Sequence, residues 1–377
     1  VTHDRAVVEL SRGCTRGCRF CQASQLSRPV RERPAEEALD LVKRSVLSTG
    51  WEQAGFLTLS YSDYSSLGGL LDGLEPLERE LHVRVSQPSL RPDTLPGLER
   101  KRFFRGSLTM APEAGTERMR RIINKPLSDD EILQAAETAS RMGARGIKLY
   151  FMVGLPGETD QDVEAIAAIG DRISRIMGKK RKVTVALSPF VPKPHTPFQW
   201  CPQPDPDEMW RRISLVRQHC RKAEVSWNDP RVSRVEHLLS TGGEGTADIL
   251  EKAFLKGAVF DGWSDLFKWE IWSGLLPENH RVPVPGDPLP WDFVDLGVDR
   301  EWLLRDYVSA LGGGILPDCR EAGCSGCGAC SGQVPGMPSG GLEQSSPGKR
   351  ADEPQAVQRV RVKYSRLGLA AFTSHLD

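Results

Sequence analysis

The sequence predicts an α/β fold built on a parallel sheet, and three observations lead to this prediction. Short apolar runs of strand length alternate with segments of helical periodicity from the N-terminus to about residue 190. Helix-start and helix-stop residues separate them: Ser128 and Glu131 form a capping box, and Gly50 and Gly143 end helices. The stretches between successive strands leave room for helices, which parallel strands need as crossovers.

Six strands are expected before residue 190. In chain order they are Ala6–Leu10, Gly55–Ser60, Leu81–Gln87, Gly106–Ala111, Gly146–Val153 and Val183–Ser188. Helices are expected from Pro34, near Thr116–Ile123, from Ser128 and from Thr159. From about residue 205 to 310 the periodicity becomes mainly helical, so we expect a helical extension behind the sheet.

The composition gives no indication of a nucleic-acid-binding or membrane-spanning protein. The chain has 377 residues, with 50 lysines and arginines balanced by 50 aspartates and glutamates, so its bulk charge does not indicate a nucleic-acid partner. No apolar run approaches the ~18–20 residues of a membrane span, so we expect no membrane partner and a cytoplasmic location. Because the chain begins at Val1 without a methionine and stops at Asp377 inside an element, we expect it to be a fragment.

Three cysteines lie on one short loop after the first predicted strand. Cys14, Cys18 and Cys21 have C-x3-C-x2-C spacing, and flanking glycines allow the backbone to curve around a ligand. Three thiolates are one short of a closed zinc site, whereas a four-iron cluster held by three cysteines keeps one iron open. The alternatives are zinc with a recruited fourth ligand such as His3, or three reduced thiols without a metal.

A second cysteine cluster lies near the end of the chain. Cys319, Cys324, Cys327 and Cys330 have C-x4-C-x2-C-x2-C spacing and are interleaved with glycines. Four thiolates at this spacing predict a metal site, since the chain's nine cysteines fall mostly in two clusters rather than in a disulfide pattern. The spacing favours an auxiliary [4Fe–4S] cluster, and zinc is the alternative.

Polar residues and glycines follow the predicted strands, where the carboxyl ends of a parallel sheet place functional groups. The candidates are Ser60, Ser62 and Asp63 after the second strand, Arg91 and Asp93 after the third, Glu113 and Gly115 after the fourth, and Gly154 and Pro156 after the fifth. Asp63 also fits a helix cap and Arg91 a surface ion pair with Asp93. The charge run Arg118, Arg120, Arg121 and Lys125 is typical of a solvated helix face.

The motifs together resemble the radical S-adenosylmethionine (radical SAM) superfamily. The resemblance lies in the cysteine loop with Phe20 before its last cysteine, and in the Gly-Leu-Pro-Gly-Glu-Thr turn that starts at Gly154. The runs Ala-Pro-Glu-Ala-Gly and Phe-Val-Pro-Lys-Pro-His-Thr-Pro-Phe are similar to an uncharacterised bacterial radical SAM family. That family is fused to a "radical SAM-linked" domain and often carries an upstream cobalamin-type domain.

The resemblance implies a partial (β/α)6 barrel in which Cys14, Cys18 and Cys21 hold a catalytic [4Fe–4S] cluster. S-adenosylmethionine would bind the open iron and be cleaved reductively to a 5′-deoxyadenosyl radical, with an electron from a flavodoxin- or ferredoxin-type donor. The implied cofactor contacts are Phe20, Ser60, Ser62, Asp63, Glu113, Gly154 and Pro156. No residue is assignable as the hydrogen-atom partner, and cobalamin would require an N-terminal domain that this sequence lacks.

The expected organisation has four parts. Residues 1–200 form the barrel, residues 201–330 a helical extension that ends in the four-cysteine site, residues 331–357 a flexible linker, and residues 358–377 the truncated start of a radical SAM-linked domain. The substrate is not apparent, although RNA or protein is a candidate. The alternatives are a methylthiotransferase-like or cobalamin-assisted methylating enzyme, and a non-catalytic RNA-binding module stapled by metal.

Overall fold

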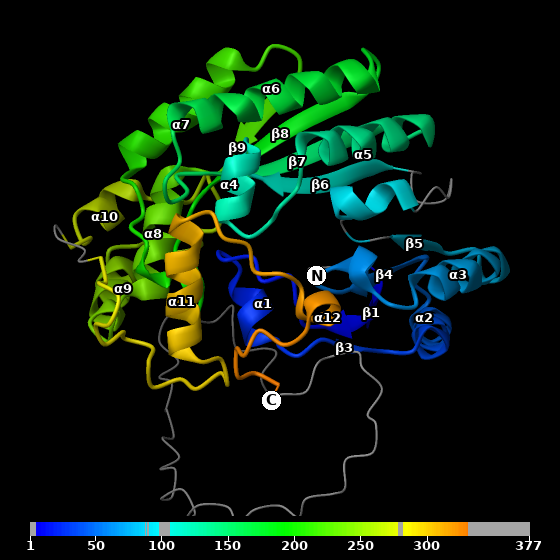
Figure 1. Cartoon of the computed structure of the whole chain (residues 1–377), viewed down its shortest axis with the longest axis horizontal. Coiled ribbons are helices and arrows are strands. Elements are labelled where there is room, and N and C mark those ends of the chain that lie inside the picture. Colours follow the sequence, from blue (N-terminus) through cyan, green and yellow to red (C-terminus); the bar gives the residue numbers. More distant parts are fainter. Residues whose placement is uncertain (1–4, 87, 89, 98–105, 278–281, 331–377) are drawn as a thin grey trace, which may run out of the picture. The chain divides into compact units, whose positions relative to one another are not determined.

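The computed structural model describes residues 5–86, 88, 90–97, 106–277 and 282–330 (Figure 1). All of them belong to one compact unit. The predicted linker at 331–357, the predicted domain start at 358–377 and the candidate ligand His3 lie outside the described residues.

Parallel strands form two sheets, which confirms the predicted α/β class. The first sheet has the order β1-β4-β5, with β1 at Ala6–Glu9, β4 at Gln53–Leu57 and β5 at Arg84–Ser86. The second sheet has the order β6-β7-β8-β9 and comprises the strands Ser107–Glu113, Gly146–Val153, Lys182–Pro189 and Glu224–Trp227. The neighbouring strands of each sheet pair in parallel, and the strand order follows the chain as in a partial barrel.

All six predicted strands are present, and two features of the sheet were not predicted. The third predicted strand starts later than expected because helix α3, Leu67–Leu81, extends through its first residue. Strand β9 adds a seventh parallel strand beside β8, and β2 (Ser11–Arg12) pairs antiparallel with β3 (Arg31–Glu32). The β2–β3 pair precedes and follows the cysteine loop, so it closes the base of that loop.

Helices cover the strands as the sequence signals predict. Helix α2, Ala35–Thr49, packs on β1 and ends at Gly50, which adopts the left-handed conformation at φ 70°. The predicted capping box of Ser128 and Glu131 starts α5, Asp129–Arg141, and a second box at Thr159 starts α6, Asp160–Met177. The short α4 spans Glu117–Ile122.

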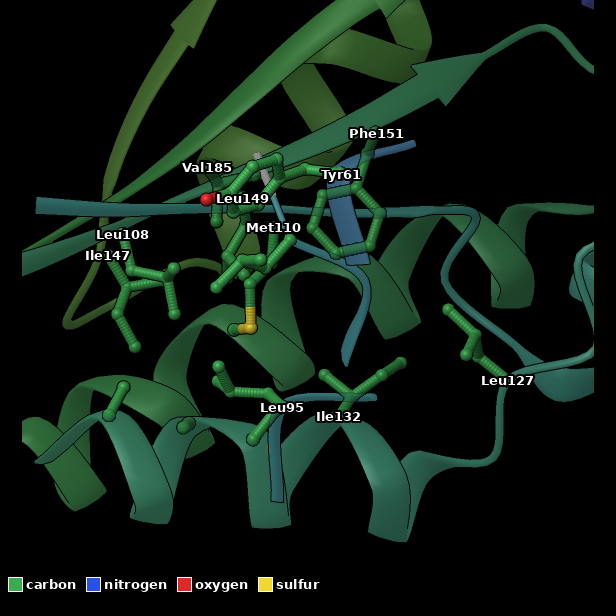
Figure 2. Packing of buried hydrophobic residues seen from close by; sticks show 14 of the residues in the cluster. Tyr61, Leu95, Leu108, Met110, Leu127, Ile132, Ile147, Leu149, Phe151 and Val185 are labelled. Atoms are coloured by element: carbon green, nitrogen blue, oxygen red, sulfur yellow. The ribbon is translucent and has the colours of Figure 1, made fainter. Parts of the chain in front are cut away.

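One hydrophobic core joins the two sheets. Tyr61, which follows β4, lies in the same cluster as Met110 of β6, Leu149 of β7 and Ile132 of α5 (Figure 2). These side chains are fully buried, so they hold the carboxyl ends of strands from both sheets in one packed body.

The chain after β8 is mainly helical, which confirms the predicted extension. Its helices are α7 (Pro206–His219), α8 (Pro230–Thr241), α9 (Thr246–Leu255), α10 (Trp269–Ser273), α11 (Arg300–Leu311) and α12 (Cys319–Ala322). Of the helices in the described residues, none combines the length and apolar character that a membrane crossing requires.

Candidate functional site

The three cysteines of the first motif lie on the loop between β2 and α1, Gln22–Leu26. Cys21 caps this helix, and its N–H donates to the carbonyl of Cys18 at 3.1 Å. Gly13 has φ +98°, and a Cβ at this position would lie 2.5 Å from the carbonyl oxygen of Ser27. Only glycine therefore fits where the loop begins. The three thiols are free and half-buried.

The thiols lie in a desolvated environment that contains positive charge. Burial raises the pKa of Cys14, and burial raises the pKa of Cys18 to about 12. The charge of Arg91 acts in the opposite direction on the pKa of both thiols, and Lys125 does so on the pKa of Cys18. Because buried thiols ionise when they bind a metal, and nearby cations favour the thiolate form, this donor set fits an anionic metal–thiolate centre.

The two cations come from different elements, Arg91 from the segment after β5 and Lys125 from the segment after α4. Arg91 follows β5 and forms a two-point ion pair with Asp93, with nitrogen–oxygen distances of 3.1 and 2.9 Å. Lys125 follows α4 and is 8% exposed. The prediction of a solvated charge run is therefore wrong for Lys125 and for Arg120, which is fully buried. Each has a specific role in the interior: Lys125 pairs with Glu113, and Arg120 donates to three backbone carbonyls and to Asp129.

Glu113 lies at the carboxyl end of β6 in a strained backbone conformation. Its φ is 70°, in the left-handed region that a glutamate rarely adopts, and the pairing with β7 shifts register between Met110 and Glu113. Its Oε1 lies 3.1 Å from Nζ of Lys125. Such strain persists where surrounding structure fixes it, often at functional sites. Gly115 faces the backbone of α6, where a Cβ would lie 2.1 Å from the carbonyl oxygen of Asp162.

Asp63 lies beside the cysteine loop and is already paired. It ends a 3-10 turn, Tyr61–Asp63, and its carboxylate accepts from Nε of Arg16 at 3.0 Å and from Oγ of Ser60 at 2.6 Å. Asp63 therefore is not a helix N-cap. Ser60, Asp63 and Cys14 line one small cavity. Ser62 accepts a hydrogen bond from the backbone N–H of Arg91 at 3.3 Å.

The remaining candidates are Phe20, which lies on the cysteine loop, and Gly154 and Pro156, which lie at a strand end. Phe20 packs against the main core. Gly154 and Pro156 follow β7, the strand next to Glu113. Gly154 has φ +86°, and a Cβ there would lie 2.2 Å from Cε of Met209, so its close packing is against α7. Its N–H donates to Glu158 at 2.6 Å.

Buried side chains tie the cysteine loop to the helical extension. The guanidinium of Arg19 is fully buried and donates to Asp306 of α11 at 3.0 and 2.7 Å. It also donates to the carbonyl of Gly314 at 2.9 Å. Asn124 donates to the carbonyls of Arg16, at 3.0 Å, and Leu316, at 2.9 Å, and accepts from the N–H of Leu316 at 2.8 Å. The extension therefore forms part of the wall around the cysteine loop.

The sequence analysis did not single out the residues that connect the cysteine loop to the helical extension. Arg16 and Arg19 are inside the cysteine motif, so their position was a signal, but their partners lie far along the chain. Asn124 had no local signal except that asparagine tolerates left-handed backbone, and its φ is 54°.

The four-cysteine segment begins at α12. Cys327 is buried, Cys319 and Cys330 are half-buried and Cys324 is exposed, all as free thiols. Among the described residues, no three histidine, cysteine or carboxylate side chains converge on a point that could hold a single metal ion. This holds for both cysteine clusters.

Comparisons with known proteins point to one superfamily. The family model described as the radical SAM superfamily matches residues 8–169, which include the first cysteine loop and the Gly-Leu-Pro-Gly-Glu-Thr turn. An uncharacterized protein of Methanocaldococcus jannaschii is 35% identical over 193 residues, which cover 51% of this chain and 42% of that protein.

Two more distant relatives have named activities. The tRNA-2-methylthio-N(6)-dimethylallyladenosine synthase of Kineococcus radiotolerans is 23% identical over 296 residues, covering 75% of this chain and 54% of that protein. The ribosomal protein uS12 methylthiotransferase RimO of Desulfotalea psychrophila is 23% identical over 302 residues, covering 75% of this chain and 66% of that protein. The chain thus spans about half the length of the first two relatives.

Solved structures resemble the chain over part of its length. Methylornithine synthase (PylB) aligns with a TM-score of 0.41 and 14% sequence identity, covering 63% of this chain and 70% of that protein.

Proposed function

We propose that Cys14, Cys18 and Cys21 hold a [4Fe–4S] cluster at which S-adenosylmethionine is cleaved, since residues 8–169 match the family model of the radical SAM superfamily. The observation that carries this proposal is the environment of the trio. Three free, partly buried thiols lie on one loop, and Arg91 and Lys125 provide positive charge beside them. An electron donor of the flavodoxin or ferredoxin type would supply the reducing equivalent.

The bound cluster and S-adenosylmethionine would supply reductive cleavage of a sulfonium carbon–sulfur bond and a carbon radical that abstracts hydrogen. The residues of this chain would position these groups. Glu113 has a carboxylate suited to accept hydrogen bonds from ribose hydroxyls, and its Oε1 lies 3.1 Å from Nζ of Lys125. Ser60, Ser62 and Asp63 would offer polar atoms from the end of β4, and Gly154 and Pro156 would contact the adenine from the end of β7.

The substrate class of two relatives suggests a narrower function. Enzymes that act on tRNA and on ribosomal protein uS12 are similar to three quarters of this chain. We infer that RNA or a ribosomal protein is the first substrate class to test, with methylthiolation as the first reaction.

The test is an assay of 5′-deoxyadenosine after anaerobic reconstitution, reduction and addition of S-adenosylmethionine. The wild-type chain should form 5′-deoxyadenosine, and Cys18→Ala should form none. Cys220→Ala is the matched control because Cys220 is a half-buried free cysteine on α7's C-cap, outside the loop. Product from Cys18→Ala at the wild-type rate would contradict the proposal.

A chain that binds about four irons but never forms 5′-deoxyadenosine would instead favour the non-catalytic alternative. RNA binding that falls steeply with salt concentration would then identify a binding module. Iron content should be measured on the same samples, so that loss of the cluster is separated from loss of turnover.

A further inference from the structure

The four-cysteine segment packs directly on the first cysteine loop through an ionic cluster. Asp318, the residue before Cys319, lies 3.5 Å from Nε of Arg16, which stands between Cys14 and Cys18. Arg320, the residue after Cys319, donates to the carbonyl of Asp63 at 3.1 Å and pairs with Asp318 at 3.0 Å. Residues on both sides of Cys319 are therefore fixed to the wall of the first site.

Arg28 occupies the space between the two cysteine segments. Its Nη1 lies 3.4 Å from Sγ of Cys327, and its guanidinium lies 5.2 Å from the ring centroid of Trp302. On the other side, a Cβ added to Gly17 would lie 3.6 Å from Nη2 of Arg28. This Nη2 is buried and has no hydrogen-bond partner among the described residues. The guanidinium of Arg28 thus lies between Gly17 of the first cysteine loop and Cys327 of the second segment, with its Nη2 atom buried.

The backbone around the four thiols is shaped to hold sulfur ligands. Gly323, Gly326 and Gly328 have φ values of +87°, +71° and +89°, so the chain reverses repeatedly within a few residues. The N–H of Gly326 donates to Sγ of Cys324 at 3.3 Å. Hydrogen bonds of this kind to sulfur tune iron–sulfur clusters.

Packing against α11 holds this segment in place. The indole N–H of Trp302 donates to the carbonyl of Ser325 at 3.0 Å, and the N–H of Asp299 donates to the carbonyl of Cys327 at 2.9 Å. Cys327 also belongs to a buried cluster with Trp291 and Trp302. The segment is therefore anchored even though its thiols do not converge on one ion.

We propose that Cys319, Cys324, Cys327 and Cys330 bind a second iron–sulfur cluster, docked on the loop that carries Cys14, Cys18 and Cys21, with Arg28 between the two. The spacing favours iron–sulfur over zinc. Structural zinc sites typically take two pairs of ligands from separate parts of the chain, whereas here all four thiols lie within one continuous segment with two consecutive C-x2-C steps. The contact between Cys327 and the half-buried guanidinium of Arg28 also suits an anionic centre.

In neither cysteine cluster, among the described residues, do three thiols lie close enough to bind one metal ion, so this observation does not distinguish the two clusters. It applies equally to the first trio, which lies within the radical SAM match. Closure of the thiols is expected on metal binding, because binding of the metal is coupled to folding of the segment that supplies its ligands.

The first experiment counts metal per chain after anaerobic reconstitution, with zinc measured on the same samples. The wild-type chain should bind about eight irons and eight sulfides, and Cys324→Ser/Cys327→Ser about four. Cys14→Ser/Cys18→Ser should also bind about four, in a spectroscopically different cluster. Cys220→Ser is the matched control and should equal wild type. About four irons with one zinc in wild-type chain would overturn the proposal.

This design separates the proposal from the proposed function. If the wild-type chain binds no first cluster, Cys14→Ser/Cys18→Ser will contain as much iron as wild type. If the wild-type chain binds no second cluster, Cys324→Ser/Cys327→Ser will contain as much iron as wild type. Circular dichroism of both double variants checks that they fold. If Cys324→Ser/Cys327→Ser does not fold, iron content and electron paramagnetic resonance of the single variant Cys324→Ser decide, since Cys324 is exposed.

The second experiment tests the position of Arg28. Arg28→Gln removes the positive charge beside Cys327, so the second cluster should become harder to reduce in a potentiometric titration followed by electron paramagnetic resonance. Arg31→Gln is the control, because Arg31 is exposed at the end of the same loop. An unchanged potential and spectrum in Arg28→Gln would overturn the placement of the cluster beside Arg28.

Discussion

Arg16 and Asp63 join the cysteine loop to the end of the first sheet, with Nε of Arg16 lying 3.0 Å from Oδ2 of Asp63. The Asp63 side chain is 7% exposed and that of Arg16 is 21% exposed, so water screens this pair poorly. The pairing with Arg16 and Ser60 lowers the pKa of Asp63 against the effect of burial. Asp63 is therefore a charged anchor of the loop.

Asp63→Asn should destabilise the chain by about 1.5–3 kcal/mol, because it removes a hydrogen-bonded charge partner from a poorly solvated arginine. Denaturant unfolding measures this change. Asp40→Asn is the matched control, since Asp40 pairs with Arg44 at 2.8 Å on an exposed face and should cost less than about 1 kcal/mol. Equal losses in the two variants would contradict a buried role for Asp63.

Glu113 and Lys125 should be energetically coupled. In a double-mutant cycle with Glu113→Gln and Lys125→Met, the coupling energy should reach about 1–3 kcal/mol, because each single change leaves a buried charge unpaired. The exposed pair of Glu80 and Lys43, at 2.8 Å, is the control and should couple by less than about 1 kcal/mol. Additive single effects at Glu113 and Lys125 would rule out the pairing.

Because the backbone of Glu113 is left-handed, glycine should be more stable than alanine at this position, the reverse of the order inside a helix. Glu113→Gly should be more stable than Glu113→Ala by about 1 kcal/mol, since glycine adopts positive φ without steric cost. At Glu137, an exposed position inside α5, the order should reverse, because glycine is unfavourable within a helix. Chemical unfolding of the four variants measures both differences, and the same sign at both positions would refute the assigned conformation.

Glu158 should make stability depend on pH. Burial raises the pKa of Glu158 to about 7, against hydrogen bonds from Gly154 and Arg212. A raised carboxyl pKa contributes stability in acid that is lost as pH rises through about 7. Glutamine stays neutral, so Glu158→Gln should gain stability relative to wild type between pH 5 and pH 8, by an amount on the order of 2 kcal/mol.

Unfolding curves at several pH values test this expectation for Glu158→Gln. Glu137→Gln, an exposed substitution on α5, should follow the wild-type curve. A stability difference between Glu158→Gln and wild type that stays constant across this range would show that the carboxyl does not titrate there.

Arg19 should not tolerate replacement by lysine. Its guanidinium donates to Asp306 and to the carbonyls of Ile122 and Gly314, and one ammonium cannot reproduce this planar set. Arg19→Lys should cost about 1–3 kcal/mol, because lysine keeps the charge but leaves buried carbonyl acceptors without a donor. Arg305→Lys on the exposed face of α11 is the control and should be within about 0.5 kcal/mol of wild type.

The sequence contained enough information for the six strands before residue 190, because their apolar runs are bounded by turn and cap residues. Strand β9 was missed because Glu224–Trp227 is short and mostly exposed, so it has no buried alternation. The two-residue strands β2 and β3 carry no periodic signal at all.

For the candidate site, spacing revealed the ligands but not their surroundings. The cysteine loop was evident because its residues are close in sequence. Arg19 and Asp306 lie 287 positions apart, so only folding brings them together. Lys125 resembled its charged neighbours in the sequence, and its burial depends on packing at the end of α4 rather than on local pattern.

Asn124 has a consequence for how the protein is made. Its one amide group holds the carbonyls of Arg16 and Gly17 together with the backbone of Leu316. During synthesis the segment that completes the enclosure of the cysteine loop is made almost three hundred residues after the loop itself. Cofactor loading before that moment would meet an open loop, so the finished site belongs to the released chain rather than to the nascent one.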